Sequence, residues 1–113
     1  MVSPADELTA ALADAGVTTM FGLPGGGANL DVVGAGLDRG IEFVLAHGEN
    51  AAAIMAATHG LLTGTPTPVV VTRGPGATSV TNGAAQATLD RFPLVVITDT
   101  VAQADRDLSL IHI

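Results

Sequence analysis

The features of this chain best suited to chemistry are one glutamate and two turns that contain glycine and proline. Glu49 follows His47-Gly48 directly, the segment Phe21-Gly22-Leu23-Pro24-Gly25 precedes it, and Gly74-Pro75-Gly76 comes after it. A carboxyl group can hold or share a proton, and glycine lets a backbone approach a ligand closely. Each feature is weak alone, because glycine and proline occur in turns everywhere and the helix dipole favours a first-turn glutamate. Their order and spacing make them a candidate site.

Several other kinds of site do not fit the sequence. The run Gly25-Gly26-Gly27 lacks the third glycine and the later acidic residue of a dinucleotide-binding motif, and a tight turn explains it equally well. The absence of lysine excludes a P-loop. The absence of cysteine excludes disulfides and thiolate chemistry. His47 and His59 have no further ligands at metal-site spacing, so we expect no metal site in the chain.

The composition describes one acidic domain. The chain has 113 residues, a net charge of −7 and an apolar fraction of 48%, and it contains no apolar run of about 18 residues. We therefore expect a soluble protein with a single core and no membrane partner. Four arginines and no lysine do not make the basic surface that nucleic acids require, so we expect no nucleic-acid partner. The first residues do not resemble an export signal, which favours a cytoplasmic location.

Helical and strand patterns alternate along the chain. They predict helices at 6–15, 30–37, 49–62 and 76–89, and strands at 17–21, 41–46, 68–72 and 94–98. Apolar strands that alternate with helices form a parallel sheet with helices on both faces, so the predicted fold is a three-layer α/β/α domain with a mainly parallel sheet. The glycine motifs and Glu49 each follow a predicted strand. Because ligands of such folds bind at the carboxyl ends of the strands, we expect these motifs to converge.

This order of motifs resembles the pyrimidine-binding domain of thiamine-diphosphate enzymes, most of all acetolactate synthases and related 2-oxo-acid enzymes. The family-like stretches are Phe21-Gly22-Leu23-Pro24-Gly25, Thr63-Gly64, Gly74-Pro75-Gly76-Ala77-Thr78 and Asp90 to Thr98. The separations from Glu49 to Gly74 and from Gly76 to Pro93 fit the family pattern without a gap. The resemblance implies the thiamine-diphosphate-binding fold, incomplete at the C-terminus of this chain.

For Glu49 the resemblance implies the role of catalytic residue. Its carboxyl group would hydrogen-bond the N1′ nitrogen of the cofactor's aminopyrimidine and favour the imino tautomer, which removes the proton of the thiazolium carbon. The other cofactor-binding residues that the resemblance implies are Leu23, Pro24, Gly25, Gly74, Pro75, Gly76 and Ser79. The alternative for Glu49 is a first-turn glutamate that only stabilises its own helix.

Three positions depart from the family pattern. Gly48 stands where the family usually has histidine before the glutamate, and Ser79 stands where it usually has asparagine. A serine cannot offer both an amide donor and a carbonyl acceptor, so the pocket is modified. Arg73 stands where small residues are common, and either pairs with an acidic neighbour or a substrate carboxylate, or lies solvated. These changes put the particular substrate in doubt more than cofactor binding.

The resemblance also implies what the rest of the protein supplies. Mg²⁺ and the diphosphate would be held by a separate domain outside these residues, and flavin adenine dinucleotide is a further cofactor of acetolactate synthases. The substrate would be a 2-oxo acid such as pyruvate, decarboxylated and then protonated or joined to an acceptor. The active site would form between two subunits, which implies a homodimer or tetramer. A non-catalytic scaffold subunit, or a stand-alone pyrimidine-domain subunit that needs a partner chain, are the alternatives.

The last six residues, 108–113, match no continuation of the family pattern. Their sequence, Leu-Ser-Leu-Ile-His-Ile, equals an in-frame translation of a sequencing-library transposon end. We therefore expect a partial pyrimidine-binding domain at 1–107 and a non-native tail at 108–113.

Overall fold

The computed structural model describes residues 1–106, so the expected tail at 108–113 lies outside the described residues. Helices and strands alternate in it as predicted. In chain order the elements are α1 (Pro4–Asp14), β1 (Thr19–Leu23), α2 (Ala28–Asp38), β2 (Glu42–Leu45), α3 (Glu49–Thr63), β3 (Thr67–Val71), α4 (Pro75–Ser79), α5 (Thr81–Asp90), β4 (Leu94–Thr98) and the 3₁₀ turn η1 (Gln103–Asp105). Within this part of the chain no helix is long and apolar enough to cross a membrane.

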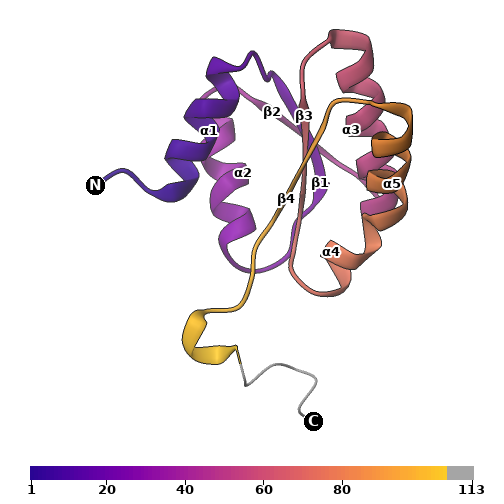
Figure 1. Ribbon diagram of the computed structural model, residues 1–113. Helices are drawn as coiled ribbons and strands as arrows, with labels where there is room; N and C mark the ends of the chain where they lie inside the picture. The colour runs from indigo at the N-terminus through magenta and orange to yellow at the C-terminus, as the bar shows by residue number, and fades with distance from the viewer. Residues whose placement is uncertain (107–113) are drawn as a thin grey trace.

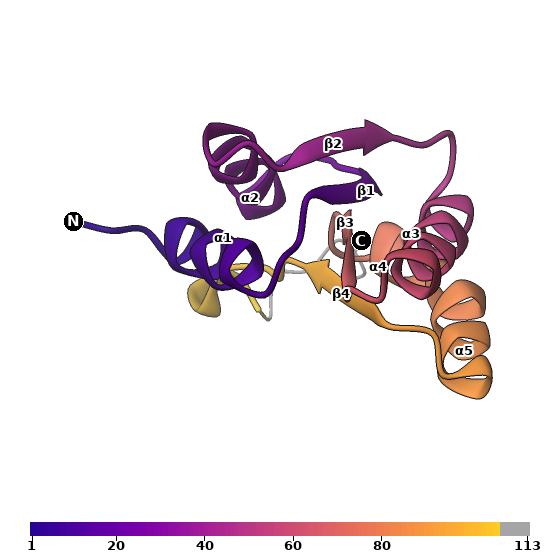
Figure 2. The same ribbon diagram turned by 90° about the horizontal axis from the view of Figure 1, so that it is seen from above.

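The strands form one parallel sheet between two groups of helices (Figure 1), and their order in the sheet is β2-β1-β3-β4. Helices α1 and α2 cover one face, and α3 and α5 cover the other, as Figure 2 shows from above. This arrangement confirms the predicted three-layer α/β/α fold with a parallel sheet.

Alternate residues of the strands supply the two halves of the core. Met20 and Val70 face α1 and α2, where they pack with Leu12, Val32 and Val33. Phe21, Val69 and Val71 face α3, where they pack against a row of its alanines. This alternation follows from the pleat of a strand, which sends successive side chains to opposite faces. Both faces of β3 are fully buried, so its apolar run has no polar positions.

Helix α3 lies close to its neighbours because one of its faces carries only small residues. Its buried positions are Ala52, Ala53, Ala56, Ala57 and Gly60. A Cβ built at Gly83 of α5 would lie 2.5 Å from the Cβ of Ala53, and one at Gly60 would meet the backbone oxygen of Pro93. The contact between the two helices therefore requires a glycine on α5. This packing fixes the position of α3, and Glu49 is the first residue of that helix.

Most predicted boundaries differ from the observed ones by one or two residues, and two of the differences have a clear physical reason. The first strand was expected at 17–21 and lies at Thr19–Leu23, because the N–H of Val17 donates to the oxygen of Leu12 and closes the end of α1 instead. The helix expected at 76–89 is divided into α4 and α5 at Val80. Hydroxyls of Thr78 and Thr81 donate to the carbonyls of Gly74 and Thr78, and such side-chain bonds bend or interrupt helices.

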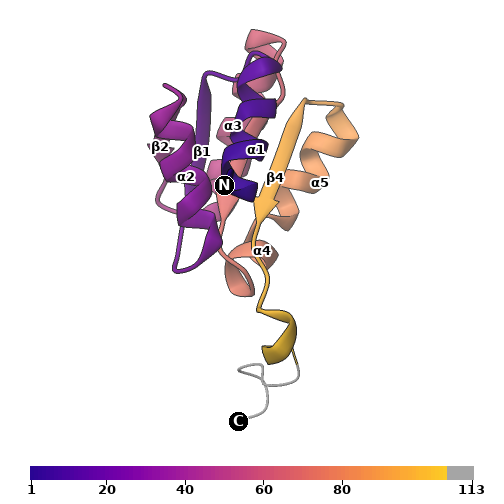
Figure 3. The same ribbon diagram turned by 90° about the vertical axis from the view of Figure 1, so that its left-hand side faces the viewer.

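The strand register places three chain segments side by side at the carboxyl end of the sheet. Leu23, Val71 and Thr98 are aligned across β1, β3 and β4. The residues that follow them, at the start of each connection, therefore begin at the same level. Figures 1 and 3 show the loop before α2 and the short helix α4 at this lower end of the molecule.

Candidate functional site

Thr72 lies between the two glycine-bearing turns and brings them together. A Cβ built at Gly25 would lie 2.9 Å from the Cβ of Thr72, and one at Gly76 would lie 3.0 Å from its Cγ2. Both glycines are thus in contact with one side chain at the end of β3. Any larger residue at either position would have to displace Thr72, since real Cβ atoms do not approach so closely.

The carboxylate of Glu49 lies beside Gly76. A Cβ at Gly76 would be 3.5 Å from Glu49 Oε1, so the glycine leaves the space next to the carboxylate open. Glu49 is half-buried, and no group within residues 1–106 donates a hydrogen bond to its carboxylate. The three sequence motifs therefore converge as expected, and their meeting point contains a carboxylate that is free to bind a ligand.

Local backbone geometry explains the shape of the Gly74-Pro75-Gly76 turn. Gly74 has φ +72° and ψ −122°, a conformation that only glycine adopts readily. Pro75 follows at the first position of α4, where its missing N–H has no consequence. Gly48 is different: its φ of −168° is extended backbone, and a Cβ there would meet nothing within 4 Å. The backbone at this position could therefore accommodate a histidine, and the glycine here removes a side chain without requiring a special backbone conformation.

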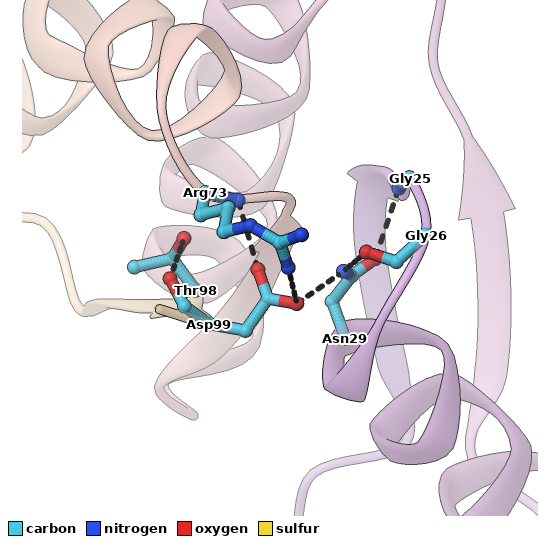
Figure 4. A network of polar contacts seen from close by, with 6 residues as sticks. All are labelled: Gly25, Gly26, Asn29, Arg73, Thr98 and Asp99. Atoms are coloured by element: carbon cyan, nitrogen blue, oxygen red, sulfur yellow. Dashed lines mark hydrogen bonds and ion pairs between the residues drawn. The ribbon is translucent and has the colours of Figure 1, made fainter. Parts of the chain in front are cut away.

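A network of polar side chains joins the same turns from the other side (Figure 4). Asn29, which is 1% exposed, accepts a hydrogen bond from the N–H of Gly25 at 2.9 Å and donates to the oxygen of Gly26 at 3.2 Å. It also donates to Asp99 Oδ2 at 2.9 Å. Asp99 Oδ1 accepts from the backbone N–H of Arg73 at 2.8 Å. The network therefore joins the β1–α2 loop, the β3–α4 turn and the end of β4.

Arg73 pairs with an acidic neighbour, one of the options that the sequence left open. Its Nη1 lies 3.6 Å from Asp99 Oδ2, and its side chain is 47% exposed, against 6% for Asp99. Burial alone would raise the pKa of the Asp99 carboxyl, but hydrogen bonds from Asn29 and from the Arg73 N–H outweigh it and hold that pKa below its usual value. Asp99 is therefore an ionised, nearly buried acceptor.

The remaining predicted residues take varied positions. Leu23 ends β1 and Pro24 follows it, both half-buried. Ser79 is the exposed last residue of α4, and no hydrogen bond within residues 1–106 joins it to the cluster. His59 Nδ1 lies 3.0 Å from the hydroxyl of Thr67, and its ring meets Phe21 edge to face. Among the described residues no group of three or more potential ligands could hold a metal.

An open groove elsewhere in the fold is distinct from this cluster. Its volume is about 890 Å³, and it is lined by α1, α2 and the end of β4. Asn29 and Asp99 line it, whereas Glu49, Thr72 and Gly76 do not. Because Glu49, Thr72 and Gly76 lie outside this groove, the candidate site is defined by the convergence of the motifs and not by the groove.

Sequence reasoning missed Thr72, Asn29 and Asp99. The rule that ligands bind at the carboxyl ends of parallel strands was applied to the first three strands, and it would have identified Asp99 if it had been applied to the fourth. Asn29 could have been noticed as a polar residue beginning a helix directly after a glycine run. Thr72 carries no signal of its own, because a threonine after a β-branched strand is common.

Comparison with known proteins places the chain in a family. It matches the model described as "Thiamine pyrophosphate enzyme, N-terminal TPP binding domain" over residues 3–112, and it belongs to this family. It is 43% identical over 96 residues to an acetolactate synthase of Bacillus subtilis, covering 84% of this chain and 16% of the relative. It is 44% identical over 103 residues to the large subunit of acetolactate synthase isozyme 3 of Escherichia coli, covering 90% of this chain and 18% of the relative.

A third relative, the acetolactate synthase large subunit of Buchnera aphidicola from Acyrthosiphon pisum, is 41% identical over 105 residues. That match covers 92% of this chain and 18% of the relative. The chain thus spans less than a fifth of the length of each of these three relatives. These relatives are homologues of this domain along almost all of its length, whereas most of their own sequence has no counterpart here.

Proposed function

We propose that this chain supplies the pyrimidine-binding half of a thiamine-diphosphate site in an acetolactate synthase-like enzyme, with Glu49 as the acid that activates the cofactor. The observation that carries the proposal is the half-buried Glu49 carboxylate, which has no partner within residues 1–106 and lies 3.5 Å from the position of a Gly76 Cβ. The family membership and the acetolactate synthase relatives support it.

The residues around this carboxylate fit a flat heterocycle. Gly76 and Gly25 lie on either side of Thr72 and have no side chains. The walls of the proposed site are therefore backbone, and a flat ring can approach this backbone closely. Leu23, Pro24 and Gly25 would line one wall, and Gly74 with Pro75 and Gly76 the other. Ser79 would reach the ring only from the edge of the site, since it lies at the exposed end of α4.

The chemistry is divided between the cofactor and the chain. When bound, thiamine diphosphate supplies an acidic thiazolium carbon and an electron sink for the decarboxylation of a 2-oxo acid. Glu49 holds or shares a proton at the pyrimidine N1′ nitrogen through a hydrogen bond, and thereby sets the tautomer of the ring. The half-buried position of Glu49 at the start of α3 limits the access of water to this carboxylate.

The remainder of the proposal concerns the protein beyond these residues. We place Mg²⁺ and the diphosphate in another domain of a longer chain, contributed by a second subunit, so that the active enzyme is a homodimer or tetramer. A 2-oxo acid such as pyruvate is the proposed substrate, and flavin remains an additional cofactor to be tested. A cytoplasmic setting is part of the same proposal. The relatives support this view because each is several times longer than this chain.

The test compares the protein that carries this domain with its Glu49→Gln variant. We expect pyruvate turnover to fall by about 10²-fold or more, while thiamine diphosphate still binds. Glu42→Gln, an exposed carboxylate on β2, is the matched control and should keep its activity. Equal turnover in the Glu49→Gln variant and the parent would refute the role of Glu49. Cofactor binding without turnover in the parent, across a panel of 2-oxo acids, would favour the scaffold function.

A further inference from the structure

Asn29 and Asp99 form a hydrogen-bonded latch across the two turns that the proposed function assigns to the cofactor. One end of the latch is the N–H of Gly25, which donates to Asn29 Oδ1, and the other is the N–H of Arg73, which donates to Asp99 Oδ1. The two side chains meet through Asn29 Nδ2 and Asp99 Oδ2 at 2.9 Å. Three consecutive hydrogen bonds thus connect Gly25 to Arg73, and the middle one joins two side chains that are 70 positions apart in the chain.

The two side chains of the latch are almost completely buried, unlike those of a surface contact. Asn29 is 1% exposed and the Asp99 side chain 6% exposed, so each donor or acceptor that loses its partner there is costly. Gly27 has φ +110°, and a Cβ on it would lie 2.6 Å from Asp99 Oδ2. Glycine is therefore required at position 27 both by the positive φ of the backbone and by the space that the Asp99 carboxylate occupies.

Each end of the latch is adjacent to a proposed wall of the pyrimidine site. Gly25 contacts Thr72, and Arg73 lies between Thr72 and the Gly74-Pro75-Gly76 turn. Neither Asn29 nor Asp99 hydrogen-bonds Glu49. Their effect on chemistry would therefore pass through the position of the two backbone walls.

We propose that Asn29 and Asp99 are positioning residues that hold the Pro24-Gly25 wall and the Gly74-Gly76 wall at the separation that the cofactor's pyrimidine ring requires. This inference rests on the proposed function of the site. It assigns a role to residues that themselves touch no substrate and no cofactor. It also gives Arg73 a specific part: its backbone N–H is held at 2.8 Å, whereas its guanidinium lies 3.6 Å from the same carboxylate.

The direction of the hydrogen bonds allows a reciprocal exchange of the two residues as a test. In Asn29→Asp two carboxylates face each other. In Asp99→Asn the new amide NH₂ must face either the Arg73 N–H or the Asn29 NH₂, so two donors meet. In the double variant the amide at position 99 accepts from Arg73 and donates to the carboxylate at position 29, which still accepts from Gly25. The double variant loses the bond to the oxygen of exposed Gly26 and the ion pair between Asp99 and the half-exposed Arg73 guanidinium, and its net charge is unchanged.

The experiment uses the protein that carries this domain, with thiamine diphosphate as the probe. We expect each single variant to raise the cofactor concentration for half-maximal activity by about tenfold, with a smaller change in kcat at saturation. The double variant should recover most of the affinity. A control pair on the exposed surface of α5, Asn82→Asp and Asp90→Asn, should leave the cofactor affinity unchanged. Arg73→Ala keeps the backbone N–H and should cost less than either single variant.

Hydrogen exchange of the two turns separates this inference from the proposed function. Peptides that cover Gly25 and Arg73 should exchange faster in the single variants and as in the parent in the double variant. Unchanged exchange in the singles would overturn the latch, and faster exchange with unchanged cofactor affinity would overturn its positioning role. If the parent does not bind the cofactor, the proposed function and the positioning role fail together, while the exchange rates still decide whether the latch orders the turns. If a single variant does not fold, a double variant that also fails to recover overturns the latch.

Discussion

Gly76 keeps the space beside the Glu49 carboxylate open, and this missing side chain is as important to the site as the carboxylate itself. A Cβ there would lie 3.5 Å from Glu49 Oε1 and 3.0 Å from Thr72 Cγ2. Gly76 lies inside α4, where alanine is the better helix former. Helix propensity therefore does not explain the glycine, whereas its close contact with Thr72 and the space that it leaves beside the carboxylate do.

Gly76→Ala tests this argument. We expect the half-saturating concentration of thiamine diphosphate to rise by about tenfold, the cost of one crowded contact of about 1.4 kcal/mol. The unfolding free energy should fall as well, because the new Cβ would also crowd Thr72 Cγ2 at 3.0 Å. Gly34→Ala is the matched control, since Gly34 lies in α2 with nothing within 4 Å of a Cβ. It should raise stability by about 0.5–1 kcal/mol without altering cofactor affinity. Unchanged cofactor affinity in Gly76→Ala would show that the ligand does not use this space.

The ionisation of Asp99 gives a pH-dependent prediction. Its pKa is lowered in the folded protein, so the unfolded chain binds more protons near that pH and the folded state gains stability as the pH rises. The contribution of the Asp99 charge to the unfolding free energy is complete above about pH 4, where the pKa of an aspartate usually lies. It is lost as the pH falls through the lowered pKa of the folded protein. The difference in unfolding free energy between the parent and Asp99→Asn should therefore narrow below about pH 4. A difference that stays constant across this range would mean that the charge of Asp99 does not contribute.

At the level of single residues, the sequence predicted the residues of the motifs but not the residues that contact the motifs and hold them in place. Glu49, Gly25 and Gly76 were identified from spacing, and the structure brings them together. Thr72, Asn29 and Asp99 were not, because their roles depend on contacts between separate strands and loops. The register that aligns Leu23, Val71 and Thr98 has no signature within any one segment.

Helix α3 carries Glu49, and its position depends on the small residues between it and α5. The Ala53–Gly83 contact has no room for a further carbon atom. Asn50, the neighbour of Glu49, has a buried Oδ1 without a hydrogen-bond partner in the part of the chain described. A Cβ at Gly83 would also lie 3.3 Å from that atom. A shift of α5 would therefore be transmitted to the first turn of α3.

Gly83→Ala tests this element contact. We expect a loss of about 1–3 kcal/mol of unfolding free energy from overpacking. Adding Ala53→Gly should recover part of that loss by removing the opposing methyl group, which gives a favourable coupling energy in the double-mutant cycle. Gln86→Ala, exposed on the same helix, should stay within about 0.5 kcal/mol of the parent. Additive effects of the two glycine–alanine changes would contradict direct contact.

Element types and their order were predictable, whereas most boundaries were predicted only to within one or two residues and one helix was divided. Apolar runs alternating with helical patterns fix the parallel sheet, because every buried strand here is covered on both faces. The start of β1 depends on the closing turn after α1. The division of the helix expected at 76–89 depends on threonine hydroxyls that take backbone carbonyls. In both cases local groups compete for backbone hydrogen bonds, and the hydrophobic periodicity of the sequence carries no information about such competition.

For the whole molecule, the described sheet is open at both ends, with β2 and β4 as edge strands. Val96 of β4 is 40% exposed, an apolar side chain on an unpaired edge. The chain spans less than a fifth of the length of the three acetolactate synthases compared above. The parallel order and the site at its carboxyl end were predictable from this segment. The proposed substrate, the other proposed cofactor contacts and the proposed subunit arrangement could not be derived from the residues of this segment.

The most direct measurement is the exchange of the thiazolium carbon proton of bound thiamine diphosphate with deuterium, in the protein that carries this domain and in its Glu49→Gln variant. The proposed role of Glu49 predicts that exchange slows by about 10²-fold or more while the cofactor stays bound, and that the Glu42→Gln control exchanges as the parent does. Exchange at the parent rate in the Glu49→Gln variant, with the cofactor bound, would contradict the central claim.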